Sequence, residues 1–430
     1  MDRPDSPDCT PASLSFEAAL AQVLGTLAPL TGSQDVPLDQ ALGRVLAAPL
    51  VAGMDLQPWP NSAMDGYAFA TADLDLALGD GLTLAGASLA GHPFTGTLAA
   101  GQCVRILTGA ILPAGADTIV MQEQVIVDGP RVRLTAAVRT GSNVRAPGED
   151  VRAGQIVLPA GSRLGPPQIA LAAALGQAQV TVTRRPRVAL FTSGDELTPL
   201  GQPLAAGAIY DSNRYLLRAL LQEMGMPVID LGIVADDPDA VRAAFAAARA
   251  QADVVISSGG VSVGDADYVR DVFREFGDIH FWRIDMKPGR PLAFGRLGET
   301  WFFGLPGNPV STAVTFLEFV RPALRLLEGE PASPPLRLEL PLLEALHKAP
   351  GRLDFQRGIL ARDAAGRLGV RSAGHQGSHV MSSLAAADCL MVLPASAGDL
   401  PAGTPVPVEL LPWAGTPTRE VRRLVDKPRR

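Results

Sequence analysis

The clearest hydrophobic pattern lies in the middle of the chain, where short apolar runs alternate with helix-like segments. Each run is rich in valine, isoleucine, leucine or phenylalanine and ends at a glycine-rich or acidic turn, which predicts a buried strand. Between the runs, apolar residues recur at helical spacing, as over 216–224. This alternation predicts a doubly wound, parallel α/β sheet. The runs are 188–191, 228–234, 254–257 and 301–305.

The pattern changes on both sides of this α/β segment. Near the N-terminus, Ser15 can cap a helix that runs to about Leu27, and a second helix is predicted over 39–48. Between about 51 and 139, short apolar stretches separated by Gly, Pro and Asp predict a β-rich insert. Beyond about 331 alternating stretches return, which favours a small β-barrel or a β-sandwich. The chain is therefore predicted to be a multidomain α/β and β protein.

The turns that follow the predicted strands carry most of the candidate chemistry. Right-handed crossovers place the carboxyl ends of parallel strands on one edge, where open α/β sheets bind ligands. The glycine-rich segment 259–264 and the helix start at 306–309 offer N–H groups to an anion. A glycine-rich turn by itself is as often only a tight turn, but together these turns predict a cradle for a phosphate and a polar heterocycle. Its candidate residues are Ser193, Gly194, Gly259, Gly260, Ser262, Gly264, Pro306, Gly307, Asn308, Pro309 and Ser311.

Three acidic residues, Glu196, Asp236 and Asp267, fall on three different loops of the same edge. Asp236 and Asp267 each stand where a helix cap is expected, and this structural role is an equal alternative for either one alone. Three converging carboxylates repel one another unless a cation lies between them, and oxygen ligands beside a phosphate suit Mg²⁺. All three are therefore candidate metal ligands.

Basic residues give a second signal, because only three of the 37 are lysines. A lysine in such an arginine-rich chain can mark a site that needs a compact ammonium. Lys287 stands with Arg283 and Arg290 in a short basic segment between two strands, and we favour an oxyanion-holding role for it over plain surface charge. Lys348 and Lys427 fall in expected loop or tail segments and receive no role.

The last predicted domain contains two further candidate oxyanion-binding residues and one alternative metal site. Arg357 and Ser378 could complete an oxyanion pocket, although nothing in their local sequence requires it. His375 and His379 have the spacing of a zinc pair on a helix. The glycines around them argue against a helix, so metal ligation there is the weaker interpretation.

Composition narrows the class of protein. A chain of 430 residues is long enough for several domains, and its net charge of −7 argues against general nucleic-acid binding. It contains no apolar run of about 18 residues and no signal pattern, so we expect a cytoplasmic protein without a membrane segment. Cys9, Cys103 and Cys389 are odd in number and far apart, which favours reduced thiols over a disulfide framework.

The ordered motifs together resemble those of the MoeA family of molybdopterin molybdenumtransferases, which includes the gephyrin E-domain. Motifs of this kind run along nearly the whole chain and are very specific as a set. The resemblance implies an elongated homodimer whose active site is shared between the subunits. The matching stretches are 61–68, 105–110, 148–150, 192–197, 259–268, 287–289, 304–311 and 374–379.

The resemblance also implies four domains. Domain I is split between 1–52 and 142–182 and serves dimerisation, and the β-rich domain II is inserted at 53–141. Domain III, 183–331, is the central doubly wound α/β domain, which binds the pterin and its AMP. Domain IV, 332–430, is a small C-terminal β-barrel.

Roles for single residues follow from the resemblance as well. Asp65 and Thr108 match functional positions of the inserted domain that act across the dimer. Asp150, with the substrate-binding candidate Arg145 nearby, matches a further acidic position. These residues are therefore expected to contribute to catalysis or binding from outside the α/β domain.

In the α/β domain, the resemblance makes Glu196, Asp236 and Asp267 catalytic, with Asp267 the first choice as metal ligand. Pro306 and Pro309 are expected to shape the cleft. Arg283 stands where lysine is frequent in the family, so the substrate-binding role expected of it is less secure. The implied molybdate-holding residues are Lys287, Arg357 and Ser378.

The implied activity is the Mg²⁺-dependent insertion of molybdenum from molybdate into adenylylated molybdopterin, with release of AMP. The implied partners are the molybdopterin adenylyltransferase and apo-molybdoenzymes, with no nucleic acid and no membrane. A catalytically idle scaffold, a nucleotide-dependent sugar or pterin kinase, and the adenylyltransferase itself are the alternatives. The intact motif residues, the missing phosphate-loop lysine motif and the additional domains argue against them in turn.

Overall fold

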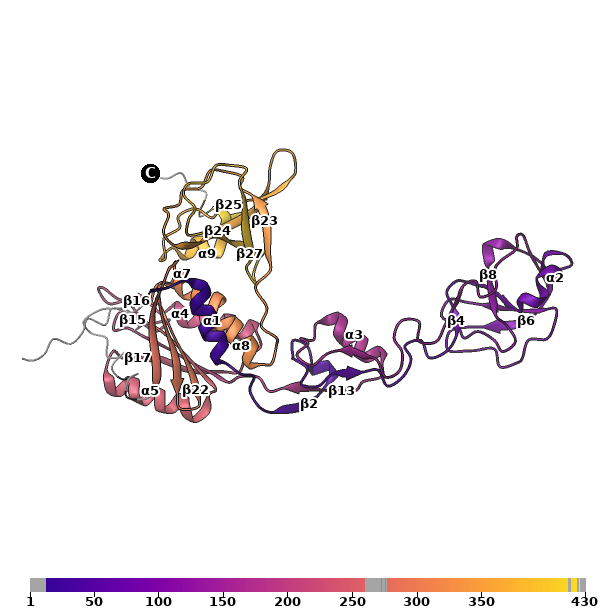
Figure 1. Ribbon diagram of the computed structural model, residues 1–430, viewed down its shortest axis with the longest axis horizontal. Helices are drawn as coiled ribbons and strands as arrows, with labels where there is room; N and C mark the ends of the chain where they lie inside the picture. Colours follow the sequence, from indigo (N-terminus) through magenta and orange to yellow (C-terminus); the bar gives the residue numbers. More distant parts are fainter. Residues whose placement is uncertain are drawn as a thin grey trace, which may run out of the picture. The chain divides into compact units, whose positions relative to one another are not determined.

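The computed structural model describes residues 13–259, 272, 275, 277–416, 419–423 and 425. The chain forms two compact units, one of Met1–Ser33 with Thr183–Arg430 and the other of Gln34–Val182. Figure 1 shows the elements of both units. Among the described residues, no helix has the length and apolar character needed to span a membrane.

The first unit is built on a seven-stranded sheet with the order β1-β19-β21-β22-β18-β14-β17. Strands β14, β17, β18 and β22 run parallel, and the winding direction reverses between β14 and β18. Doubly wound sheets bind ligands at such a reversal, and the predicted α/β domain is confirmed. The strands are β1 (Ser13–Leu14), β14 (Val188–Ser193), β17 (Val228–Val234), β18 (Val254–Ser258), β19 (Asp278–Ile284), β21 (Pro291–Leu297) and β22 (Thr300–Leu305).

One side of this sheet is antiparallel, which the sequence pattern did not predict. Strand β21 pairs antiparallel with both β19 and β22. The connection from β19 to β21 is short, whereas parallel neighbours need a crossover of a dozen or more residues. The same connection carries the short strand β20 (Met286–Lys287), which pairs with a strand of the last domain instead.

Helices cover both faces of the sheet (Figure 1) because successive strand residues point to opposite sides. Val188 and Leu190 share one buried cluster with α1 and α4, whereas Ala189 and Phe191 share another with Phe245 of α5. The segment from α7 through η4 to α8 belongs to the first cluster. The helices are α1 (Phe16–Thr26), α4 (Asn213–Glu223), α5 (Pro238–Gln251), α7 (Pro309–Thr315), η4 (Phe316–Val320) and α8 (Arg321–Leu327).

The N-terminal segment confirms one predicted helix and contradicts another. Ser15 caps α1 by accepting a hydrogen bond from the Ala18 N–H at 3.1 Å. The helix packs with the α/β unit, where Phe16 is buried. The predicted helix over 39–48 is wrong. Only a 3₁₀ turn forms, η1 (Leu38–Gln40), and the chain then leaves it through Gly43, whose φ is +72°.

The last domain is a small β-barrel, as predicted. Its strands pair in the order β25-β24-β26-β27-β23. Leu342, which follows β23, bridges Val370 of β25 and so closes the barrel. Strand β20 joins this barrel to the α/β sheet by pairing Lys287 with Asp354. The elements are β23 (Arg337–Pro341), β24 (Leu353–Arg362), β25 (Leu368–Ser372), α9 (Met381–Ala386), β26 (Cys389–Leu393), β27 (Pro405–Leu410) and α10 (Arg419–Arg423).

The second unit contains the predicted β-rich insert, a six-stranded sheet with the order β8-β5-β7-β6-β10-β9. The rest of the unit consists of helix α3 and short strand pairs β11–β4, β12–β3 and β13–β2. The sheet strands are β5 (Gly66–Phe69), β6 (Leu82–Ser88), β7 (Gln102–Ile106), β8 (Thr118–Met121), β9 (Val125–Asp128) and β10 (Arg131–Leu134), with α2 (Leu74–Leu78), η2 (Thr71–Asp73) and η3 (Gln122–Gln124) between them. The remaining elements are β2 (Ser33–Pro37), β3 (Leu50–Val51), β4 (Asn61–Ser62), β11 (Val144–Arg145), β12 (Ile156–Leu158), α3 (Pro166–Ala174) and β13 (Gln179–Thr183).

Candidate functional site

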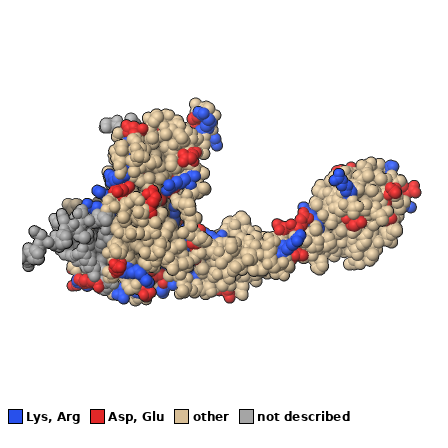
Figure 2. Space-filling model, in the orientation of Figure 1, with Lys and Arg blue, Asp and Glu red and all other residues tan. Residues whose placement is uncertain are grey.

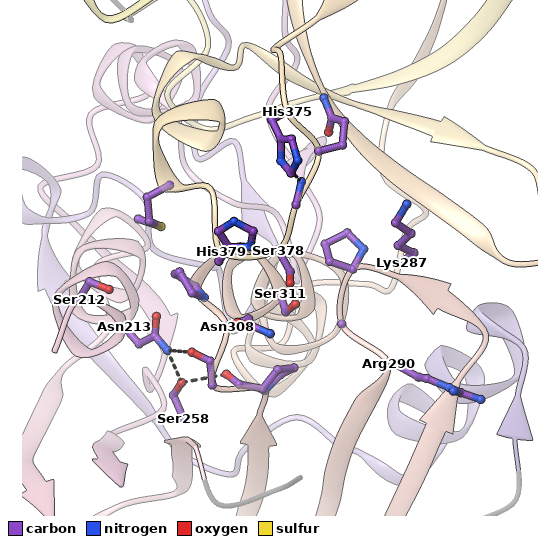
Figure 3. Close-up of a pocket in the computed structure, with 18 of the residues that line it drawn as sticks. Ser212, Asn213, Ser258, Lys287, Arg290, Asn308, Ser311, His375, Ser378 and His379 are labelled. Carbon is purple, nitrogen blue, oxygen red and sulfur yellow. Dashed lines mark hydrogen bonds between the residues drawn. The ribbon is translucent and has the colours of Figure 1, made fainter. Parts of the chain in front are cut away.

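A large cavity lies in the first unit, between the carboxyl ends of the parallel strands and the β-barrel (Figure 3). Its volume is about 1910 Å³, which exceeds the roughly 300–1,000 Å³ of ordinary small-molecule sites. Turns after β14, β17, β18 and β22 line one part of it, and the β20 segment and barrel loops line the rest. The cavity can therefore hold a ligand larger than a simple nucleotide.

The predicted cradle residues that the structure describes all line this cavity. Gly259 has a φ of +96°, and a Cβ there would collide with the Ser193 carbonyl oxygen, so the turn requires glycine. The cradle members Gly260, Ser262 and Gly264, like Asp267, lie outside the described residues. The lining members are Ser193, Gly194, Gly259, Pro306, Gly307, Asn308, Pro309 and Ser311.

Hydrogen bonds fix the turn before α7 against the end of β18, as Figure 3 shows. Asn213 Nδ2 donates to Ser258 Oγ at 2.9 Å and to the Gly307 carbonyl at 2.7 Å. Ser258 Oγ in turn donates to the Pro306 carbonyl at 3.0 Å. At the start of α7, the Val310 N–H donates to the Ser378 carbonyl at 3.0 Å. One N–H in the first turn of α7 thus holds the barrel rather than an anion.

Four acidic residues line the cavity: Asp211 is buried, Glu344 belongs to the barrel, and Glu196 and Asp236, both exposed, form the acidic set at the strand-end turns. Partial burial and the neighbouring carboxylates of Asp195 and Glu196 raise the pKa of Asp236 above its usual range. Asp236 is not the cap of α5, because Asp237 accepts the N–H groups of Asp239 and Ala240. Its carboxylate is therefore available to a ligand, and the electrostatics of the set favour a cation.

A complete metal site does not appear among the described residues. No group of three Asp, Glu, His or Cys side chains there is arranged to hold an ion. Asp267, the first choice as ligand, lies outside them. His375 and His379 line the cavity with their ring centroids 5.9 Å apart, and His375 Nδ1 already accepts the Gly377 N–H at 3.0 Å.

The basic set of the cavity consists of Lys287, Arg290, Arg352 and Arg371. Lys287 and Arg290 come from the segment around β20, as Figure 3 shows, and the other two come from the barrel. Arg283 does not line the cavity. It lies on β19, in register between Ser13 and Pro291, because the β19–β21 hairpin continues the sheet past it.

Three family models match the chain in order. The model described as the MoeA N-terminal region, domains I and II, matches 14–176. A probable molybdopterin binding domain matches 189–326, and the MoeA C-terminal region, domain IV, matches 339–411. A molybdopterin molybdenumtransferase of Haemophilus influenzae is 41% identical over 400 residues, which cover 92% of this chain and 98% of that protein.

The chain belongs to the MoeA family of molybdopterin molybdenumtransferases. Molybdopterin molybdenumtransferase 2 of Mycobacterium tuberculosis is 36% identical over 401 residues, 91% of this chain and 97% of that protein. A crystal structure of a molybdopterin biosynthesis MoeA protein from Pyrococcus horikoshii matches with a TM-score of 0.81 and 27% identity. The match covers 93% of this chain and all of that one.

Within this MoeA-family cavity, Arg357 has a different place from the one expected. It is only 1% exposed and does not line the cavity. Its guanidinium donates to the carbonyls of His375 and Gly377 at 3.1 and 3.0 Å and to Ser383 Oγ at 3.1 Å. Burial lowers its pKa to about 10. Arg357 therefore supports the loop that presents Ser378, which does line the cavity.

The candidates in the second unit form two local groups. Asp65 Oδ1 accepts the Thr108 N–H and the Thr108 hydroxyl, both at 2.7 Å. These bonds hold the pKa of Asp65 below its usual range, so the predicted pair is brought together and charged. Arg145 lies on β11, in register with Asn61, and Asp150 is exposed after it.

Several cavity residues escaped sequence reasoning. Asn213 begins α4 and could have been found as a polar residue at a strand-end turn. Arg352, Arg371 and Gln356 belong to the barrel, and no local pattern sets them apart. On the face that Figure 2 shows, described acidic and basic side chains are mixed, without the extended basic area typical of nucleic-acid binding.

Proposed function

We propose that this chain transfers molybdenum from molybdate to adenylylated molybdopterin and releases AMP. One observation carries the proposal. In a chain of this family, a cavity at the winding reversal of the sheet is lined by the exposed carboxylates of Glu196 and Asp236 and by the Lys287 ammonium. A substrate with a phosphoanhydride and an incoming oxyanion needs a cation site and an anion site within one cavity.

The α/β part of the cavity suits the pterin phosphate and the AMP. The turns at Ser193–Gly194, Gly259 and 306–309 offer backbone and hydroxyl groups that are held in place by the Asn213 and Ser258 hydrogen bonds. Lys287 and Ser378 then hold the oxyanion. Arg357 keeps the Ser378 loop in place through the carbonyls of its neighbours.

The acidic set fits Mg²⁺ in its chemistry. Oxygen ligands beside a phosphate are what Mg²⁺ prefers, and burial, followed by the charges of Asp195 and Glu196, raises the pKa of Asp236. We assign Glu196, Asp236 and Asp267 as its ligands. When bound, Mg²⁺ supplies polarisation of the phosphoanhydride. Glu196 and Asp236 would hold it from the turns at the strand ends.

The family membership also supports a homodimer in the cytoplasm, with Asp65, Thr108 and Asp150 acting at the cavity of the second subunit. An adenylyltransferase supplies the substrate, and apo-molybdoenzymes take the product. Mixed dimers test the shared site: Asp65→Ala and Lys287→Ala chains, each inactive alone, should recover part of the activity when they are combined. No recovery would place both residues in one subunit's site.

The direct experiment uses the purified full chain with adenylylated molybdopterin, molybdate and Mg²⁺. AMP release and activation of an apo-molybdoenzyme should each require all three components. AMP release that ignores molybdate would indicate a hydrolase or an adenylyltransferase instead. Absence of both products would reject the proposal.

A further inference from the structure

Lys287 forms an ion pair with the buried carboxylate of Asp354, and Gln356 links that carboxylate to the His347 carbonyl, next to a second lysine, Lys348. Lys287 Nζ lies 3.8 Å from Asp354 Oδ2, and the two residues are register partners of β20 and β24. Asp354 is only 5% exposed, whereas the Lys287 side chain is half-exposed at the cavity. Lys348, which received no role from the sequence, is 2% exposed.

Lys348 is fixed at a position where its ammonium interacts electrostatically with the Asp354 carboxylate. Its ammonium donates to the carbonyls of Ala349 and Ala397 at 3.2 and 3.0 Å. Burial lowers the pKa of Lys348, the Asp354 carboxylate opposes that shift and the Lys287 ammonium adds to it. The three charges therefore interact as a group.

Asp354 has further partners that fix it in place. Gln356 Nε2 donates to Asp354 Oδ2 at 2.9 Å and to the His347 carbonyl at 3.4 Å. The Asp354 charge also raises the pKa of Arg357 against the effect of burial. A buried carboxylate surrounded in this way is costly to leave without a counter-ion.

The two ammonium groups differ in freedom. Lys287 can turn its flexible stem toward the cavity, because half of its side chain is in solvent. Lys348 is buried and tied to two carbonyls, so it stays where it is. An oxyanion that draws Lys287 away therefore leaves Asp354 with Lys348 as its remaining ammonium.

We propose that Asp354 and Lys348 set the strength of oxyanion binding. Asp354 is the counter-ion that the oxyanion displaces from Lys287, and Lys348 is the buried cation that lowers the cost of this exchange. Both are positioning residues, since neither is assigned to touch the substrate. The inference rests on the proposed function, because it takes molybdate as the oxyanion.

A double-mutant cycle tests the proposal, because the two single substitutions should change the molybdate Kd in opposite directions. The Kd is measured by calorimetric titration of molybdate into the full chain. Lys348→Met keeps the stem and removes the charge, so Asp354 holds Lys287 more strongly and the molybdate Kd should rise about fivefold. Asp354→Asn removes the competitor and should lower the Kd by about threefold. Because Lys348 acts through the Asp354 charge, its substitution should have no further effect once that charge is gone, so the double variant should bind like Asp354→Asn, about threefold more tightly than the wild type.

Control measurements separate this role from a structural one. Arg184→Met removes a bidentate pair with Asp253, which precedes β18 at the opposite end of the sheet from the cavity. It should lower the melting temperature and leave the molybdate Kd unchanged. In all variants the Kd of AMP, measured alone, should stay at the wild-type value.

Weaker molybdate binding in both single variants, or an unchanged Kd in Lys348→Met, would overturn the proposal. Failure of the proposed function looks different: the wild-type chain then binds no molybdate and releases no AMP. If Asp354→Asn fails to fold, Lys348→Met alone still tests the proposal, because its molybdate Kd should rise while that of the Arg184→Met control stays unchanged.

Discussion

The acidic and basic sets of the cavity differ in what already balances their charge. Asp236 lies beside the carboxylates of Asp195 and Glu196, and no described lysine, arginine or histidine forms an ion pair with these three. Lys287, by contrast, lies 3.8 Å from the carboxylate of Asp354, which is buried. The acidic set therefore lacks a counter-ion among the described residues, whereas Lys287 already has one, the Asp354 carboxylate, that an oxyanion could displace.

This difference indicates how the two sets respond to ligands. A cation that binds Glu196 and Asp236 relieves the repulsion between their carboxylates. It should therefore stabilise the charged form of every anionic group nearby. An oxyanion that joins Lys287 must compete with Asp354, so its binding should depend on a local exchange. Loss of a residue from each set should therefore produce a different kind of defect.

The largest effect is expected from Lys287→Met. Removing the ammonium that we propose to hold the oxyanion should lower kcat/KM for molybdate by about 100-fold, the usual size for a lost group of this kind. The Kd of AMP should change little. Arg283→Met is the matched control, since Arg283 lies on β19 outside the cavity. Steady-state AMP release at varied molybdate measures both, and equal losses in the two variants would remove the special role of Lys287.

A smaller effect is expected from the acidic set. Glu196→Gln or Asp236→Asn should raise the Mg²⁺ concentration for half-maximal AMP release by about tenfold, because each removes one charged oxygen ligand. Chelation of Mg²⁺ should stop the wild type. Asp237→Asn is the control: it removes a neighbouring negative charge, asparagine caps a helix about as well as aspartate, and the Mg²⁺ requirement should not change. An unchanged requirement in the first two variants would contradict their ligand role.

The acidic set was predictable because strand ends are a local property. Glu196 follows β14 and Asp236 follows β17 almost at once, and parallel strands bring such turns to one edge. The sequence alone could not reject the alternative role of Asp236 as a helix cap. Asp236 and Asp237 are adjacent, and only the folded structure shows that Asp237 accepts the helix N–H groups.

The basic set was predictable only for Lys287, and for a compositional reason. The barrel arginines reach the cavity because β20 leaves the sheet and pairs with β24, a contact between segments far apart in the chain. No hydrophobic period signals that pairing. Lys348 looked like a loop lysine because its burial depends on the closed barrel, and Arg357 looked like a contact residue although its side chain is buried.

A second junction between the α/β domain and the barrel sharpens the comparison, because it buries carboxyl groups without a lysine. Glu318 of η4 and Glu409 of β27 are each 4% exposed, and Glu318 Oε1 and Glu409 Oε2 have no hydrogen-bond partner among the described atoms. A proton on one carboxyl group allows a hydrogen bond to the other, which two charged carboxylates cannot form. Burial first, and then the Glu409 charge, raise the pKa of Glu318 to about 8, against the opposing charges of Arg321 and Arg337.

The smallest effect, on stability alone, is expected at this junction. Because the folded-state pKa of Glu318 lies above the ordinary value of 4.5, its contribution is complete below that value and is lost as pH rises through about 8. Glu318→Gln mimics the protonated form. The melting temperature of this variant, relative to that of the wild type, should therefore be a few degrees higher at pH 9 than at pH 5. Glu299→Gln, at a side chain 96% exposed, should run parallel to the wild type. A constant offset for Glu318→Gln would mean that this carboxyl group holds its proton no more tightly in the folded chain than in the unfolded one.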